Sequence, residues 1–189
     1  MIIGAADTGR APMAAAMLQR HMQRRYVDAL IESAGILGHD GDPATEAAQR
    51  SIEQMGLDIQ DHVARSLTDE LAASASLLIG MDSGVTRVAR SRFPSAVERI
   101  YSLGELANQE RDIPDPFKMQ IGAWLSYATE IDKLLERAMP HILMRIGASQ
   151  ESSAPVVAEQ PPSSSASAPQ AAPAPTLKRI SVSAPAPES

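Results

Sequence analysis

A short loop near the amino terminus combines residue types that bind anions. The stretch IIGAADTGRAPMAAAML runs from an apolar strand end at Ile2, through small residues, into a helical pattern. The first N–H groups of a helix have no partner within it, so such loops hold phosphate, sulfate or carboxylate groups. Arg10 adds a guanidinium that binds an oxyanion through two parallel hydrogen bonds. The loop contains Asp7 and Thr8 but no Cys, Ser, Lys or His.

Asp7 affects what this loop binds. A carboxylate repels an anion held beside it, by about 4 kcal/mol for unit charges ~4 Å apart at an effective dielectric near 20. Two arrangements remain open from the residues alone. Arg10 binds a ligand, or Arg10 and Asp7 form an internal ion pair that holds the loop closed.

Strand and helix patterns alternate around the loop. We expect strands at residues 1–3, 29–35, 75–82 and 97–103. We expect one helix with Pro12 in its first turn that runs to about residue 25, a second from about residue 43 that Gly56 stops, and a last one from near residue 120 that Pro140 kinks or ends. This alternation predicts an α/β fold, a doubly wound four-stranded parallel sheet flanked by helices. In such folds ligands bind beyond the carboxyl ends of the strands, where the loop lies.

The composition excludes several classes of function. The chain has 189 residues, one expected domain core and no Cys, which rules out disulfides, thiolate metal sites and thiol nucleophiles. A net charge of −6 and a pI near 5.2 argue against nucleic-acid binding. No apolar run reaches the roughly 18 residues of a membrane span, and no signal peptide is visible, so we expect a cytoplasmic protein.

The histidines show no spacing typical of metal ligands, so we expect neither a metal nor a cofactor. We predict a domain over residues 1–147 and a disordered Ser/Ala/Pro-rich tail over 148–189, which has too little apolar surface to fold. The tail contains one basic-apolar segment, Leu177–Val182. It is either an ordinary part of the tail, a docking segment or a phosphorylation site at Ser181.

Two Asp-Thr/Ser-Gly triplets, Asp7–Gly9 and Asp82–Gly84, invite comparison with the paired aspartates of aspartic proteases. Those enzymes are all-β, whereas each triplet here follows a strand and precedes a helical pattern. The triplets are therefore interpreted as loop residues.

Six segments, in order and at consistent spacing over residues 1–146, together resemble the low-molecular-weight protein tyrosine phosphatases. They are Arg10–Met13 (RAPM), Ser33–Ile36 (SAGI), Gly41 with Pro43, His62–Leu67 (HVARSL), Gly80–Asp82 (GMD) and Asp112–Phe117 (DIPDPF). The resemblance implies the fold of that family. It also implies that Arg10 binds phosphate, that Asp115 is the general acid and that Phe117 is an aromatic wall for the ligand.

The chain departs from this family in the loop itself. Counting back six residues from Arg10 places Gly4 where the family has its nucleophilic Cys, whose low-pKa thiolate attacks phosphorus. Asp7 stands for a loop Asn, Gly9 for a second Cys and Ala11 for the Ser that assists the nucleophile. Arg10 is the one residue of the loop's chemical part that is retained.

We therefore expect a catalytically silent phosphatase-like protein. It would bind a phosphotyrosine-bearing protein, phosphate or another oxyanion through Asp7, Thr8, Gly9, Arg10 and Phe117. One alternative is an active phosphatase that uses Asp7, or a water activated by Asp115, with Arg10 stabilising the charge. Another is a non-catalytic scaffold with a binding tail. Arsenate reduction is excluded because it requires thiols.

The first strand is unusually short for this family, since only Met1–Ile3 precede the loop. Either the fold tolerates this, or the true start lies upstream. The sequence does not indicate an oligomeric state.

Overall fold

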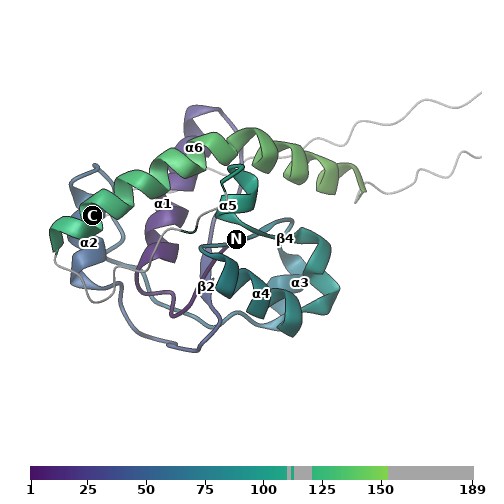
Figure 1. Ribbon diagram of the computed structural model, residues 1–189, viewed down its shortest axis with the longest axis horizontal. Coiled ribbons are helices and arrows are strands. Elements are labelled where there is room, and N and C mark those ends of the chain that lie inside the picture. The colour runs from purple at the N-terminus through teal and green to yellow at the C-terminus, as the bar shows by residue number, and fades with distance from the viewer. Residues whose placement is uncertain (110–111, 113–120, 153–189) are drawn as a thin grey trace, which may run out of the picture. The chain divides into compact units, whose positions relative to one another are not determined.

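The computed structural model describes residues 1–109, 112 and 121–152 (Figure 1). Its centre is a parallel sheet of strands β1 (Ile2–Gly4), β2 (Ser33–Gly35), β3 (Leu78–Gly80) and β4 (Ile100–Ser102), in the order β2-β1-β3-β4. Ile2 lies opposite Ser33 on one side and Ile79 on the other. The predicted α/β class and four-stranded parallel sheet are thus confirmed.

β1 has the predicted length of three residues, but β2, β3 and β4 are shorter than predicted, at three residues each. The reason is pairing, because a strand extends only as far as a neighbour matches it. β2 pairs with β1 from Ser33 onward, and before it Glu32 accepts a hydrogen bond from the N–H of Ile2 at 2.8 Å. The prediction that the strand includes residues 29–32, made from their apolar pattern, was therefore wrong.

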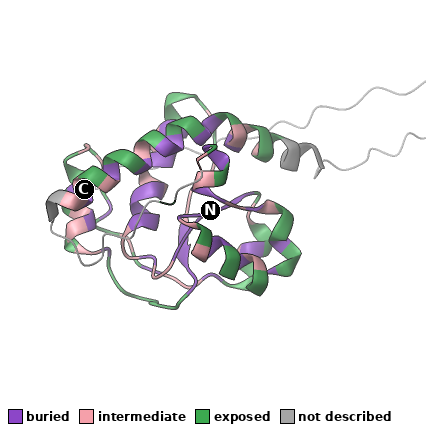
Figure 2. Cartoon of the chain, viewed as in Figure 1, coloured by how far each residue is buried: buried purple, intermediate pink, exposed green. Residues whose placement is uncertain are grey.

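Alternate residues of the strands face two separate cores. Ile2 and Ile79 belong to one buried cluster, whereas Ile3, Leu78 and Ile100 belong to the other. This alternation follows from the two-residue period of a strand. Both faces of the sheet are covered, as Figure 2 shows by the buried colour along the strands.

Helices divide between the two cores. The first is shared by α1 (Arg10–Arg24), α2 (Glu46–Glu53), α5 (Leu103–Leu106) and α6 (Ile121–Ser152). The second is covered by α3 (Asp69–Ser74), α4 (Ser83–Arg92) and the 3₁₀ helix η1 (Pro94–Arg99). The prediction that Pro12 lies in the first turn of a helix is confirmed, since α1 begins at Arg10. The predicted start of the second helix near Pro43 was wrong, because Thr45 caps α2 by accepting a hydrogen bond from Ala48 N and the helix begins at Glu46.

The buried stripe predicted for the last helix is confirmed. Its members are Trp124, Ala128, Ile131, Leu135, Ala138 and Ile142. Of the two effects expected at Pro140, an end of the helix is wrong, because α6 continues to Ser152. Buried neighbours on both sides of the proline, Met139 and Ile142, anchor the segment to the core despite the missing N–H donor.

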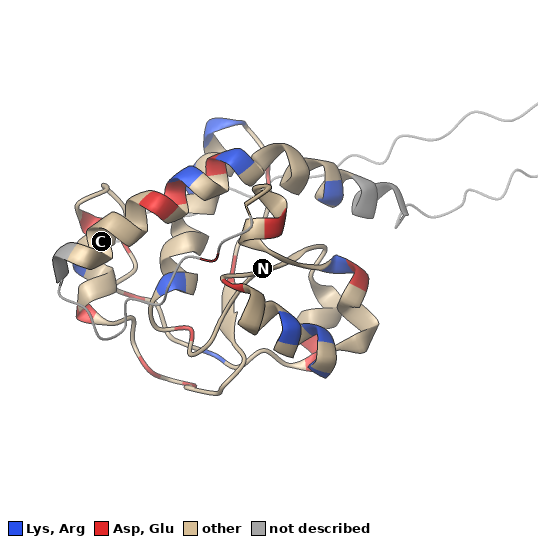
Figure 3. Ribbon diagram, in the orientation of Figure 1, with Lys and Arg blue, Asp and Glu red and all other residues tan. Residues whose placement is uncertain are grey.

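Ion pairs fix α6 against α1. Asp132 accepts from Arg20 Nη2 at 3.0 Å and lies 2.8 Å from His21 Nε2. Elsewhere on α6, acidic and basic residues are interspersed in the view of Figure 3. No described helix is long and apolar enough to cross a membrane.

Candidate active site

The loop between β1 and α1 lies at the carboxyl end of the sheet. Residues 4–11, together with Thr45 and Trp124, line a cavity of about 60 Å³. This volume is enough for a few water molecules or one small oxyanion. The loop is held in place from outside, since Thr8 O accepts a hydrogen bond from Thr45 N at 2.8 Å.

Helix α1 begins without a side-chain cap. Its N-cap residue is Gly9, which has no side chain to accept a hydrogen bond from the first turn. Within the part of the chain that the structure describes, the N–H groups of residues 5–9 donate to no protein acceptor. Unpaired donors at an uncapped helix start favour a bound anion.

Gly4 faces the inside of the loop. A Cβ added at Gly4 would lie 3.7 Å from the amide nitrogen of Asp7 and 2.8 Å from Cβ of Ala11. The second distance is shorter than carbon atoms tolerate, so a side chain at position 4 requires the start of α1 to shift. The loop has therefore closed around the missing nucleophile.

Arg10 is buried and held by an acidic partner. Its Nη2 lies 2.7 Å from Oδ2 of Asp82, and its side chain is 6% exposed. The other carboxylate oxygen of Asp82, Oδ1, accepts a hydrogen bond from Val85 N at 2.7 Å and caps α4. The residue after β3 thus orients the guanidinium that follows β1.

Asp7 is 2% exposed and has a left-handed backbone with φ of 60°. Its Oδ2 accepts a hydrogen bond from Arg65 N at 3.2 Å and lies 3.5 Å from Nε2 of His62. The same Nε2 lies 2.6 Å from the carbonyl oxygen of Asp7. The hypothesis of an Asp7–Arg10 pair was therefore wrong, because Arg10 pairs with Asp82 and Asp7 with His62.

His62 is electrostatically coupled to the loop. The hydrogen bond that His62 donates to the Asp7 side chain, supported by the Asp7 carbonyl and charge, raises the pKa of His62 above its ordinary 6.5. Burial and the charge of Arg65 oppose this rise. A protonated His62 compensates the negative charge of Asp7. Among the described groups, Oδ1 of Asp7 has no hydrogen-bond partner.

Trp124 covers the loop from α6. Its ring would lie 3.0 Å from a Cβ at Gly9, so a side chain at position 9 requires the ring to move slightly. The sequence pattern placed Trp124 on the buried stripe of the last helix and indicated no role for His62 or Asp82. His62 and Asp82 lie in motifs that carry the family resemblance, and their place in those motifs is the sequence signal that could have identified them.

Two predicted site residues, Asp115 and Phe117, lie outside the described residues. Asp112, at the start of the same motif, is described and exposed. It accepts hydrogen bonds from Ser83 N at 3.0 Å and Ser83 Oγ at 2.5 Å. This contact ties the start of the motif to the first residue of α4.

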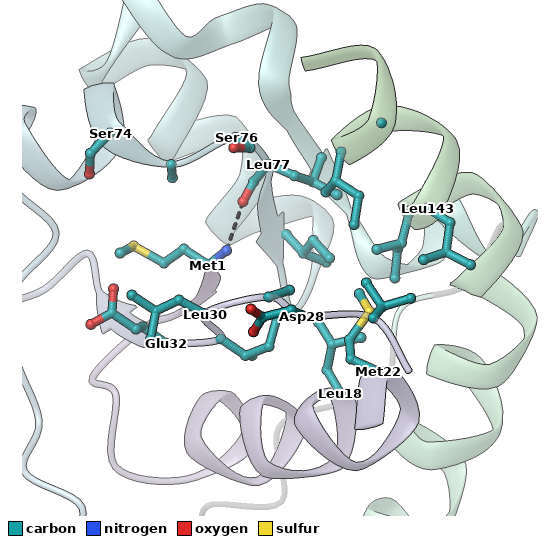
Figure 4. Close-up of a pocket in the computed structure, with 18 residues that line it drawn as sticks. Met1, Leu18, Met22, Asp28, Leu30, Glu32, Ser74, Ser76, Leu77 and Leu143 are labelled. Atoms are coloured by element: carbon teal, nitrogen blue, oxygen red, sulfur yellow. Dashed lines mark hydrogen bonds between the residues drawn. The ribbon is translucent and has the colours of Figure 1, made fainter. Parts of the chain in front are cut away.

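A larger cavity of about 700 Å³ lies elsewhere, beside the amino ends of β1 and β3 (Figure 4). Apolar side chains of α1 and α6, including Leu18, Met22 and Leu143, line part of it. Met1 N donates to the Leu77 carbonyl oxygen at 2.7 Å within it. None of the predicted site residues that the structure describes lines this cavity.

The described residues include no group of three or more His, Asp or Glu side chains that could hold a metal ion. The described loop offers its N–H groups, the Arg10 guanidinium and the Asp7–His62 pair.

Comparisons with known proteins agree with this geometry. A family profile described as "Low molecular weight phosphotyrosine protein phosphatase" matches residues 1–151. The chain is 31% identical over 133 residues to the probable low molecular weight protein-tyrosine-phosphatase EpsP of Ralstonia nicotianae, covering 70% of this chain and 88% of that protein. It is 26% identical over 132 residues to a protein-arginine-phosphatase of Bacillus subtilis, covering 69% and 87%.

Solved structures show the same fold. The low molecular weight protein tyrosine phosphatase from T. tengcongensis has a TM-score of 0.71 and 27% identity, covering 74% of this chain and 96% of that one. The YwlE arginine phosphatase from Geobacillus stearothermophilus has a TM-score of 0.68 and 26% identity, covering 77% and 94%. The chain therefore belongs to the low-molecular-weight protein tyrosine phosphatase family.

Proposed function

We propose that this protein is a catalytically silent member of its family that binds a phosphorylated protein through the loop between β1 and α1. The observation that carries the proposal is Gly4 at the position of the nucleophile, in a chain without Cys. Covalent phosphatase chemistry needs a nucleophile at that point. The contact between position 4 and Ala11 leaves no room for one without rearrangement.

Asp7 is a poor substitute nucleophile. Its carboxylate is almost fully buried, and Oδ2 already accepts a hydrogen bond from Arg65 N. It lies against His62, on the side of the loop that faces residues 62–65. An attack on phosphorus from Asp7 would first have to break these contacts.

Binding is supported by what the loop retains. The uncapped start of α1 supplies N–H donors, Arg10 supplies positive charge, and the 60 Å³ cavity matches a small oxyanion. Asp82 fixes Arg10 in one orientation, which lowers the entropy cost of binding. Arg10, Thr8 and Gly9 are the proposed ligand contacts, while Phe117 and the acid Asp115 remain predictions.

The class of ligand follows from the family. The named relatives include tyrosine and arginine phosphatases, so the proposed partner is a protein carrying phosphate on a side chain. A phosphotyrosine peptide and a phosphoarginine peptide are the two probes that distinguish these ligands.

The proposal is tested with the purified full chain. Two measurements are made: turnover of p-nitrophenyl phosphate, and the shift in melting temperature caused by inorganic phosphate. We expect no turnover and a phosphate-dependent shift that disappears in Arg10→Ala. The matched control is Asp82→Asn, which breaks the same ion pair but keeps both the guanidinium and an oxygen that caps α4, so its shift persists.

Two results would contradict the proposal. Turnover that is lost in Arg10→Ala would mean an active phosphatase with another nucleophile or an activated water. The absence of both turnover and a phosphate shift in wild type would favour a scaffold that acts through protein contacts alone.

A further inference from the structure

Asp7 places a negative charge inside a loop whose remaining features attract anions. Its side chain is almost fully buried, and one oxygen has no partner among the described groups. A buried carboxylate is unfavourable unless a cation or several donors compensate it. Here the compensating groups are the backbone N–H of Arg65 and the imidazole of His62.

Other charged groups near this pair are already engaged or lie on its far side. Arg65 forms an ion pair with Glu32 at 3.0 Å, and Arg10 is held by Asp82. Asp58, Asp61 and Glu32 line the open groove of about 450 Å³ that His62 also borders. The positive charge of Arg65 opposes protonation of His62, but its effect is smaller than that of Asp7.

We propose that Asp7 and His62 form a pH-dependent charge pair that controls the loop, which binds an oxyanion strongly only while His62 is protonated. The inference rests on the proposed function, since it concerns the same site. It adds a condition that a neutral side chain at position 7 would not impose.

The physical reason is the net charge of the pair. When His62 is protonated, the pair is neutral, and Arg10 with the N–H groups of the loop attracts the oxyanion. When His62 loses its proton, the negative charge of Asp7 is no longer compensated and repels an anion bound by the loop. Because the pKa of His62 is raised, the pH at which this loss of binding occurs is higher than for an ordinary histidine and closer to physiological pH.

Inorganic sulfate is the probe, because it remains a dianion over the whole range tested. Its affinity is measured by calorimetry on the full chain at about pH 5.5 and about pH 8.5, on either side of the ordinary His pKa. For wild type we expect a loss of about tenfold or more at the higher pH, which corresponds to at least about 1.4 kcal/mol.

Asp7→Asn is the decisive variant. Asn tolerates a positive φ and keeps an oxygen for the N–H of Arg65, so the fold of the loop is preserved. Because His62 loses the group that raises its pKa, we expect the loss of sulfate affinity in this variant to occur at lower pH than in wild type. At the higher pH the variant lacks the repelling carboxylate, so it should bind sulfate more tightly than wild type.

His62→Gln provides a second arm with the opposite result. Gln keeps a donor for the Asp7 carbonyl oxygen but carries no charge, so sulfate affinity at the lower pH falls to the wild-type level at the higher pH. His39→Gln is the matched control. His39 is half-exposed and pairs with Asp42 at 3.2 Å, so its loss leaves the wild-type pH profile unchanged.

The outcomes separate the inference from the proposed function. If wild type and Asp7→Asn bind sulfate with the same pH profile, or His62→Gln binds like wild type, the charge pair has no control over binding and the inference fails alone. If neither wild type nor Asp7→Asn binds sulfate at either pH, the proposed function fails and the inference with it.

Discussion

Two triplets of the same pattern end the two central strands, and the fold uses them differently. Asp82-Ser83-Gly84 follows β3, and Asp82 caps α4 directly with an extended backbone. Asp7-Thr8-Gly9 follows β1, but Asp7 has φ of 60° and its side chain contacts Arg65 and His62 instead of the helix. Helix α1 therefore begins at Arg10, after an N-cap residue, Gly9, that provides no side-chain cap.

The difference shows that a side-chain cap decides whether the N–H groups at a helix start are satisfied within the protein or left for a ligand. At α4 the first-turn donor of Val85 is satisfied by Asp82. At α1 the acidic side chain lies two residues before the N-cap, turned away, and the N–H groups of the loop are left for a ligand. The Arg10–Asp82 ion pair then joins the two starts.

Removing that ion pair has the largest expected effect. Arg10→Ala leaves Asp82 without its cation, and breaking a buried pair from one side costs about 3–5 kcal/mol. Asp82 is 20% exposed and still caps α4 in this variant. We therefore expect the free energy of unfolding, measured with urea, to fall by about 2–3 kcal/mol. Arg50→Ala, in the exposed pair with Glu46 at 2.5 Å, is the control and changes stability by less than ~0.5 kcal/mol. Equal losses of unfolding free energy in Arg10→Ala and Arg50→Ala would show that the buried ion pair stabilises the fold no more than an exposed one.

Restoring the family's nucleophile is expected to destabilise the loop. In Gly4→Cys the new Cβ overlaps Cβ of Ala11, and overpacking of this kind costs about 1–3 kcal/mol. Combining it with Ala11→Gly removes the clash, so the double variant should lose less stability than the sum of the single variants. Urea unfolding of all three variants measures this coupling. Simple additivity would mean that the loop has not closed around position 4.

The Asp7–His62 contact predicts a smaller, pH-dependent effect. Since the folded-state pKa of His62 lies above its unfolded value, the pair contributes its full stability below about pH 6.5 and loses it as the pH rises through the raised pKa. The difference in unfolding free energy between wild type and His62→Gln should therefore shrink from about pH 6 to about pH 9. A difference that is constant over this range would contradict the charge pair.

Thr8 has the smallest expected effect on stability. Its described hydrogen bond uses the backbone carbonyl, so Thr8→Ala keeps the contact with Thr45 N. We expect a change within about 0.5 kcal/mol in urea unfolding, in contrast with Arg10→Ala. A larger loss would show that the side chain of the triplet's middle residue supports the loop.

Much of the fold was predictable because it depends on local patterns. Apolar runs and helical stripes indicated a parallel sheet between helices, and the stripe from Trp124 to Ile142 is buried as expected. Element lengths were less predictable. β2 begins at Ser33 because its pairing with β1 begins there, and α6 passes Pro140 because packed neighbours hold it.

The sequence by itself determined the chemistry that this protein lacks and the family to which it belongs. Gly4 and the absence of Cys remove the thiolate whatever the conformation, and the order of six motifs indicated the fold. Only the tertiary structure decided the partners of the charged loop residues. Asp82 lies 72 residues from Arg10, and His62 lies 55 residues from Asp7. Sequence spacing carries no information on contacts of this length, because they form only when the sheet brings the ends of its strands together.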